Sequence, residues 1–493
     1  MTGKISRLQT ALITVFLLFM ALLPGCGGRP ARVATDVEMP AAFSSGGSDQ
    51  LPDRWWEGLD DPLLNDLERI ALAGSPTLLS ARDRLDQAAA LARAAGSSQW
   101  PAVNAEIGGS RKVIGYETSA GDRKDWSTDL SMGLQAGYEI DLWGRVGATA
   151  EAATLDAVAS AEDLRAAAVT LSASVAETWY QLVAARESLD LVGSQLEINE
   201  QTLGVVTSRF RNGQVGAVDV LQQRQLVEAK RGELARSEAR AVVLANELAV
   251  LLGESPGTDV IPDSGELVEL PLLPATGIPA ELVQRRPDVR AGFARILAAD
   301  ARAAAAAANR FPRLSLGASV SSSADHVDGF FADWLANLAA NLTMPLIEGG
   351  SRAAESDRTR AAAAEKLHAY GGIVLAAVSE VENALINEDR QQAYLLSLDR
   401  QAELSSQTVE RIRQGYLNGS HNYLRVLSSI LTDQALGLNR IEARRQLISY
   451  RIQLCRALAG GWELGSESDS GTGDSGRSRD SSQTSRSNRG ENR

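Results

Sequence analysis

The chain has 493 residues, a formal net charge of −13 at pH 7 and a pI near 5.0. This acidic balance argues against a nucleic-acid-binding protein, because such proteins need a basic surface that neutralises phosphates. The length is sufficient for one large or two medium domains.

The N-terminus reads as a targeting segment. Lys4 and Arg7 precede an apolar run at residues 11–23 that is short for a membrane helix, so residues 1–25 are predicted to be a signal peptide. The end of this run, Leu23–Cys26, resembles a bacterial lipobox, although Pro24 is an imperfect match. The resemblance implies a lipoprotein acylated on Cys26, with residues 26–50 as its tether. A plain signal peptide is the alternative.

A first structural repeat is predicted over residues 51–252. Short helices are expected before Trp100, and two stretches of alternating apolar residues follow, at about 102–116 and 126–142. This period of two is typical of strands, and each stretch is long enough to cross a bilayer, which takes roughly 9–11 residues. The polar residues 117–125 between them are expected to form a loop.

A long helical hairpin is predicted over residues 148–252. Its apolar residues recur every seven positions, which is typical of coiled coils. The Asn212-Gly213 pair interrupts the repeat with turn chemistry and predicts a tight tip. The first arm of the hairpin carries the repeat at Val175, Leu182, Leu189, Leu196, Leu203 and Phe210.

The same plan returns in a second repeat at residues 287–462, shifted by 206 at the hairpin (416 − 210). Strands are expected at about 313–323 and 334–347, and a second hairpin at 350–459 with its tip at Asn418-Gly419. Residues 253–286 are proline-rich and predict a surface connector. Residues 463–493 are rich in Ser, Arg and Asp and are expected to be disordered.

Four strands cannot span a membrane alone, because an open sheet leaves edge N–H and C=O groups in hydrocarbon. Bacterial barrels start at about eight strands. We therefore expect a mainly α fold with membrane β-strands, in which several copies of the chain close one barrel. A soluble sandwich edge is the alternative interpretation of the strands.

Six motifs in order are similar to one family, the outer-membrane efflux proteins of the TolC/OprM type, in the NodT-like lipoprotein branch. They are Tyr138–Arg145, Gln284–Arg290, Phe311–Leu316, Met344–Gly350, Tyr416–Gly419 and Arg456–Trp462. The resemblance implies a trimer with a 12-stranded β-barrel in the outer membrane and a periplasmic α-barrel. It also implies a passive exit duct for drugs or other small molecules, served by a periplasmic adaptor and an inner-membrane RND-type pump.

In that family the hairpin tips contact the adaptor, which here implies Asn212, Gly213, Asn418 and Gly419. The family's closed entrance is held by polar contacts beyond the second tip. The resemblance therefore points to an entrance group of five residues in this chain: Asp219, Tyr416, His421, Arg425 and Ser428. Because Arg425 replaces an expected acidic or polar residue, we hypothesise an Asp219–Arg425 latch between adjacent hairpins. Two solvated charges are the alternative.

The remaining histidine, acidic and cysteine residues do not form a pattern that predicts a metal site or a catalytic site. His421, His326 and His368 lie far apart and lack a cysteine partner, so no metal is expected. Glu151, Asp163 and Glu177 sit on a heptad helix without a nucleophile motif and are expected on its solvated or lumen face. Cys455 is expected to be a core residue.

We therefore predict an efflux duct rather than an enzyme, and no cofactor. Metal-ion export or type I protein secretion is the alternative within transport. A periplasmic coiled-coil scaffold without a pore is the alternative outside it.

Overall fold

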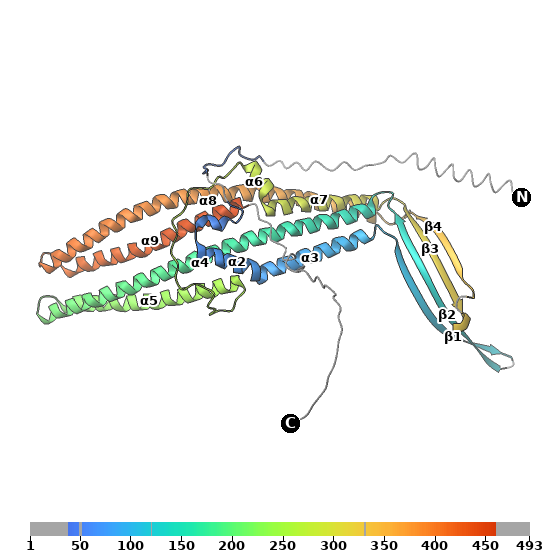
Figure 1. Cartoon of the computed structure of the whole chain (residues 1–493), viewed down its shortest axis with the longest axis horizontal. Coiled ribbons are helices and arrows are strands. Elements are labelled where there is room, and N and C mark those ends of the chain that lie inside the picture. Colours follow the sequence, from blue (N-terminus) through green and yellow to red (C-terminus); the bar gives the residue numbers. More distant parts are fainter. Residues whose placement is uncertain (1–37, 49–51, 120, 330–331, 460–493) are drawn as a thin grey trace, which may run out of the picture.

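The computed structural model describes residues 38–48, 52–119, 121–329 and 332–459. The chain is elongated, with a four-stranded sheet at one end and two helical hairpin tips at the other (Figure 1). Cys26, most of the predicted tether and the predicted disordered tail lie outside the described residues. The first repeat contains η1 (Trp55–Leu59), α2 (Pro62–Gly74), α3 (Pro76–Ser97), β1 (Ala102–Thr118), β2 (Gly121–Ile140), α4 (Arg145–Arg211) and α5 (Ala217–Leu252).

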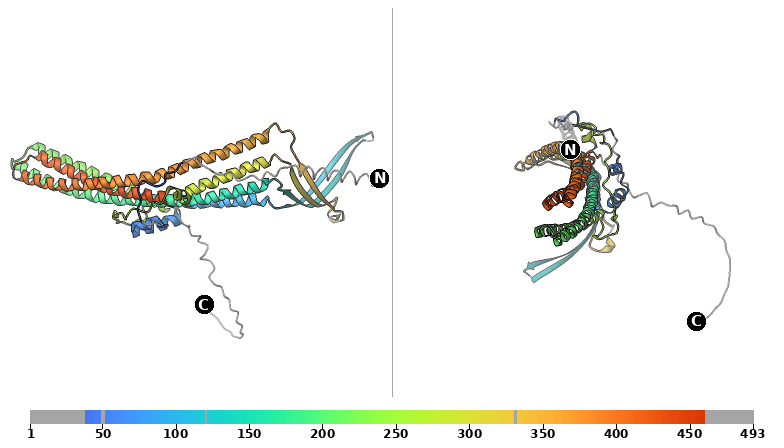
Figure 2. Two further views of the ribbon diagram at one scale, coloured as in Figure 1. Left: turned by 90° about the horizontal axis from the view of Figure 1, so that it is seen from above. Right: turned by 90° about the vertical axis from the view of Figure 1, so that its left-hand side faces the viewer.

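The second repeat has the same order of long elements. It contains α6 (Pro279–Arg285), α7 (Pro287–Ala308), β3 (Arg313–Ala324), η2 (Val327–Gly329), β4 (Leu335–Thr343), α8 (Ser351–Leu417) and α9 (Tyr423–Leu458). Helices α4 and α8 each have 67 residues, or about 100 Å at 1.5 Å per residue. The two hairpins lie side by side in both orientations (Figures 1 and 2), so the predicted duplication is confirmed.

The sheet is antiparallel in the order β1-β2-β3-β4. The prediction of a loop at residues 117–125 is wrong, because β1 continues to Thr118 and β2 already begins at Gly121. The two strands stay paired through polar residues, and their side chains still alternate between the two faces, as where Tyr116 pairs with Arg123. The predicted end of the last strand at 347 is also wrong. Strand β4 ends at Thr343, two residues before Pro345, which has no N–H to donate to a ladder.

The two faces of the sheet differ in chemistry. One face carries apolar residues from every strand, because the register places Leu134 opposite Ala105 and Val320, and Leu342 opposite Leu314. The other face is polar and small, as where Gln135 lies opposite Asn104 and Ser319. This alternation matches a membrane barrel with lipid outside and water inside.

Two motif residues fix the junction between the sheet and the helices, one across the repeats and one within the first repeat. The Trp143 indole Nε1 donates to the carbonyl oxygen of Pro312 at 2.8 Å, and its ring stacks on Phe311 at 4.8 Å. The Asp141 carboxylate accepts from the backbone N–H groups of Val146 and Gly147 at 3.0 and 2.7 Å, which caps the start of α4. These contacts give a structural reason for the motif at Tyr138–Arg145.

The main apolar core, which we call the waist core, lies where η1 and α2 pack on α4 and α5 and where α4 packs on α9. Trp55, Trp179 and Leu182 are fully buried there. The connector also joins this core through Ile261 and Leu267. It is held by arginine donors, since Arg444 bonds the carbonyl oxygen of Leu267 at 3.0 Å. The predicted surface connector is therefore a strap anchored across both repeats.

Candidate functional site

The hairpin tips have the turn geometry that their sequence predicts. Gly213 has φ +67° and Gly419 has φ +79°, in the left-handed region that favours glycine. Their backbone N–H groups close the turns onto Phe210 and Tyr416 at 2.9 and 3.1 Å. A side chain added at either glycine would meet no atom within 4 Å, so both tips are open to an approaching backbone.

Tyr416 anchors a small apolar core just behind the tips. The guanidinium of Arg209 on α4 lies 4.5 Å from its ring centroid and donates to its carbonyl oxygen at 3.3 Å. Tyr423 on α9 packs edge-on at 6.0 Å. Burial raises the pKa of both tyrosines, and the nearby Asp219 adds to the effect. This core, which we call the tip core, holds the two hairpins together within one protomer.

The predicted latch is not formed within the protomer. Across the described part of the chain, Asp219 and Arg425 form no ion pair with each other. Asp219 lies near enough to the tyrosine pair to raise the pKa of both rings, whereas Arg425 and Ser428 line an open groove of about 510 Å³ between α8 and α9. A latch between adjacent protomers stays a prediction.

The three histidines lie on separate elements. His421 directs Nδ1 at the carbonyl oxygen of Ser420, 3.0 Å away, and packs against Gly415. His326 pairs with Asp325 in the loop after β3, and His368 is exposed on α8. Among the residues that the structure describes, no group of three His, Cys, Asp or Glu side chains is placed to hold a metal.

Sequence reasoning missed a buried polar seam between the hairpins. We define it by Gln195 and Asn199 on α4, Gln223 and Lys230 on α5, and Gln434 on α9, all buried. Lys230 Nζ donates to Gln195 Oε1 at 2.7 Å, and Gln195 Nε2 donates to the carbonyl oxygen of Gln434 at 3.1 Å. Gln223 bonds the carbonyl oxygen of Asn199 at 2.7 Å and accepts from Tyr423.

The seam divides the apolar contact between the hairpins into the waist core and the tip core. Asn199 lies seven residues after Val192 and seven before Val206, which are both buried apolar residues, so its polarity within that row is a signal that the sequence offered. Gln195 lies outside the row of Val175 and Leu196 and gave no such signal. Hydrogen bonds across a buried interface specify one register between helices.

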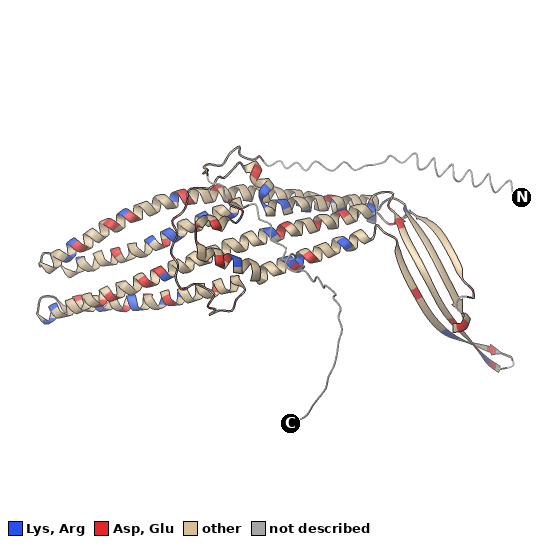
Figure 3. Ribbon diagram, viewed as in Figure 1, with Lys and Arg blue, Asp and Glu red and all other residues tan. Residues whose placement is uncertain are grey.

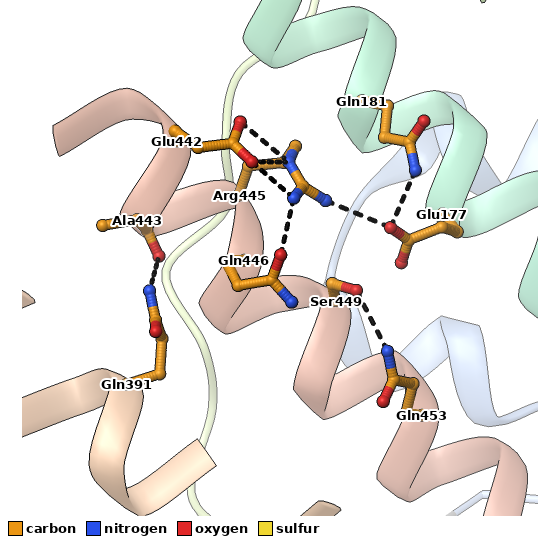
Figure 4. Close-up of polar contacts among 9 residues, drawn as sticks. All are labelled: Glu177, Gln181, Gln391, Glu442, Ala443, Arg445, Gln446, Ser449 and Gln453. Carbon is orange, nitrogen blue, oxygen red and sulfur yellow. Dashed lines mark hydrogen bonds and ion pairs between the residues drawn. The ribbon is translucent and has the colours of Figure 1, made fainter. Parts of the chain in front are cut away.

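Above the seam, arginines on α9 tie the repeats together at the waist. Arg445 forms ion pairs with Glu442 at 2.7 Å and with Glu177 on α4 at 3.1 Å, and it bonds Gln446 (Figure 4). Glu177 also accepts from Gln181. Glu177 is half-buried and is the α4 partner of a buried cation, so it ties the repeats together in addition to meeting solvent as expected.

A second arginine joins the strap to α8 and α9. Arg451 and Glu388 are both buried and form a bidentate pair, with 2.5 Å between Nη2 and Oε1. The same guanidinium donates to the carbonyl oxygens of Pro271 and Leu272. Cys455 lies one turn away and is buried, which confirms its prediction as a core residue, and burial raises the pKa of its thiol to about 12.

The remaining acidic residues serve structure. Asp163 on α4 pairs with Arg295 on α7 at a largely solvent-exposed contact between the repeats, and Glu151 is exposed. On α2, Glu68 is fully buried and both its carboxyl oxygens lack a partner in the structure. Burial raises its pKa well above the usual value, because the charged carboxylate would lose its hydration there.

Known proteins are similar to this chain over most of its length. A family model described as outer membrane efflux protein matches residues 67–254 and 278–460. The chain is 32% identical to the pyoverdine export outer membrane protein OpmQ of Pseudomonas aeruginosa, over 90% of this chain and 95% of that protein. It is 30% identical to outer membrane protein OprJ of the same species, over 89% and 92%.

Solved structures agree with these matches. The outer-membrane channel OprN superposes with a TM-score of 0.79 at 26% identity, over 87% of this chain and 99% of that chain. A membrane protein from Pseudomonas aeruginosa superposes with a TM-score of 0.78 at 29% identity, over 86% and 99%.

Proposed function

The chain belongs to the outer membrane efflux protein family, and we propose that it is the exit duct of a tripartite efflux system. It is an outer-membrane efflux channel whose helices form the periplasmic barrel. The single observation that carries the proposal is the pairing, in one chain, of a membrane-type sheet with two helical hairpins whose long arms, α4 and α8, each extend about 100 Å. Such a molecule reaches from the outer membrane deep into the periplasm.

The sheet supports a closed trimeric barrel. In the described chain β1 and β4 each pair on one side only, which leaves two open edges. Open edges in hydrocarbon cost several kcal/mol per unpaired group. Three copies that join β4 to the β1 of the next copy provide 12 strands and remove every edge.

The helices also carry apolar surface that a neighbouring copy covers in this arrangement. Helix α8 contains an 18-residue window of mean hydropathy 1.3, of which only 33% is buried within the protomer. By length and composition it could cross a membrane, but it continues unbroken to the hairpin tip. Its exposed apolar side chains include Leu375, Ile386, Leu396 and Leu404.

The hairpin tips are proposed to contact the periplasmic adaptor. Asn212, Gly213, Asn418 and Gly419 lie at the end of the molecule farthest from the sheet and are exposed. The adaptor would connect this end to an inner-membrane RND-type pump, which supplies the energy. The duct itself would be passive.

For cargo we propose small amphiphilic molecules. The relatives' names cover pyoverdine export and toluene efflux, so related ducts serve a siderophore and a solvent. The test uses a deletion strain, whose growth is measured in the presence of unrelated lipophilic drugs, solvents and metal ions. Its export of a siderophore is assayed separately. Sensitisation to several lipophilic compounds that the intact gene reverses supports the proposal. Sensitivity to metal ions alone, or loss of a secreted protein alone, contradicts it.

A pore is tested separately. The purified protein should migrate as a heat-sensitive trimer and conduct ions in a planar bilayer. A scaffold without a pore would show no conductance at any voltage.

A further inference from the structure

The outward face of the sheet ends in a cationic site. On β2 the apolar face extends over residues 130–140, or about 25 Å in height for a strand tilted by about 40°. This is the thickness of a barrel's apolar band. The next outward-facing pair beyond Gly109 and Leu130 is Arg111 opposite Thr128. The site therefore begins where hydrocarbon gives way to lipid headgroups.

The hairpin formed by β1 and β2 continues past the rest of the sheet. Strand β3 pairs with β2 only as far as Leu130, while β1 and β2 pair on to Thr118 and Gly121. Figure 3 shows that the charged residues of the sheet gather toward this far end. Its outward face is thus left uncovered by the described chain.

Arg111 is held in place by an aromatic ring. Its guanidinium lies 4.9 Å from the ring centroid of Trp126, its diagonal neighbour on the same outward face. Lys124 follows on that face, opposite Gly115, which leaves open space beside it. Within the described residues, neither Arg111 nor Lys124 forms an ion pair with a carboxylate. Both cations are exposed and available to an external anion.

We propose that Arg111, Trp126 and Lys124 form a docking site for the phosphate-bearing headgroup of an outer-leaflet lipid. The Trp126 ring lies at the boundary of the apolar band, as aromatic residues do at membrane interfaces. Stacking fixes the Arg111 guanidinium, whose planar donors suit phosphate oxygens. Lys124 supplies a second charge further along the hairpin. The acyl chains of the same lipid would lie on the apolar face next to it.

Two neighbouring features limit the site. Glu117 and Asp122 face each other on the same outward side at the hairpin tip and repel phosphate, so the headgroup level lies between them and Leu130. Lys112 and Arg123 point to the opposite, polar face, where Arg123 pairs with Asp125 at 2.9 Å. These two cations are therefore matched controls on the same hairpin.

The test uses the intact trimer in non-ionic detergent, titrated with lipid A, a diphosphorylated and acylated glucosamine disaccharide. Binding is measured by native mass spectrometry for the wild type, for Arg111→Ala/Lys124→Ala and for Lys112→Ala/Arg123→Ala. Each exposed cation near a charged headgroup contributes a factor of about five. We expect Arg111→Ala/Lys124→Ala to weaken lipid A binding about tenfold or more. Lys112→Ala/Arg123→Ala should weaken it less than about twofold.

Further arms separate the possible anions. Lipid A stripped of its phosphates should bind weakly to the wild type and equally to both variants. Equal losses in the two double variants, equal affinity for the two lipids, or full competition by inorganic phosphate would each overturn the proposal. If Arg111→Ala/Lys124→Ala does not assemble into a trimer, the single variant Arg111→Gln is compared with Lys112→Gln. Because the outward face depends on the closed barrel, trimer formation is checked first, so a failed barrel is distinguished from a failed lipid site.

Discussion

Gln195 on α4 donates its side-chain amide to the backbone carbonyl oxygen of Gln434 on α9, 3.1 Å away, and both residues are buried. The same Gln195 accepts from Lys230 on α5 at 2.7 Å, so three helices of two repeats meet at one side chain. Gly437, one turn along α9, approaches Leu191 closely enough that an added side chain would crowd it at 3.1 Å. The contact holds the hairpins in one register between the waist core and the tip core.

Replacement of Gln195 by Leu should loosen this register. The change removes the side-chain hydrogen bond to the Gln434 carbonyl and the oxygen that accepts from Lys230, whose remaining charge partner is Glu233, at a cost of about 1–3 kcal/mol in stability. If the seam keeps the entrance closed, single-channel conductance rises. The matched control is Gln201→Leu, which is exposed on the same helix. A loss of thermal stability with normal conductance would assign the seam a purely structural role.

Leucine at either tip glycine should uncouple export. In the left-handed region a side chain costs about 1–2 kcal/mol, but open space surrounds both tips, so Gly213→Leu and Gly419→Leu should still form trimers. Export should fail because the added side chain blocks the approach of the adaptor. Site-directed crosslinking to the adaptor measures this, with Gly204→Leu on α4 as a helical control that also meets no neighbour. Undiminished crosslinking at the tips would contradict an adaptor contact.

Charge reversal at Arg425 tests the latch between protomers. If Asp219 of one protomer pairs with Arg425 of the next, Arg425→Glu replaces attraction by repulsion and raises conductance in bilayers. The double variant Asp219→Arg/Arg425→Glu should return it toward the wild-type value. Arg425 is exposed within the protomer, so the single change should not affect folding. Unaltered conductance in the single variant would leave both residues as solvated charges.

Removal of one partner of the buried pair at the strap should be severe. Glu388→Ala leaves the Arg451 guanidinium buried without its carboxylate, at a cost of about 3–5 kcal/mol. The exposed pair of Asp399 and Arg440 is the comparison, and Asp399→Ala should cost about 0–1 kcal/mol. The temperature at which the trimer unfolds reports both. Equal effects would mean that the strap is not anchored by this pair.

Glu68→Gln should stabilise the protein increasingly as pH rises. Because burial raises the folded-state pKa of Glu68, its favourable contribution is complete below the unfolded pKa and is lost as pH rises toward the folded pKa. Glutamine is never charged, so it avoids this loss. The unfolding temperatures of variant and wild type should agree near pH 4 and diverge in favour of the variant at higher pH. A constant difference across pH would show that Glu68 does not titrate with folding.

Much of the fold could be predicted because it rests on local patterns. The seven-residue row that begins at Val175 specifies a long helix, although the row is buried only at its start and reaches the surface at Phe210, and Asn212-Gly213 specifies where the chain turns back. The period of two around Leu134 specifies a strand with unlike faces. The prediction of a loop at residues 117–125 is wrong because a strand ladder rests on backbone hydrogen bonds and can continue through polar residues beyond the apolar part of the sheet.

The sequence by itself determined the duplicated plan, the hairpin tips and the need for more than one copy, because periodicity, turn residues and unclosed strands are properties of short segments. Only the tertiary structure decided which residues meet between repeats. Gln195 reaches Gln434 over 239 positions, and Arg445 reaches Glu177 over 268. Such pairs depend on how long helices are placed side by side, and a shift of one residue rotates a side chain by about 100°. Partners at that range leave no local signal.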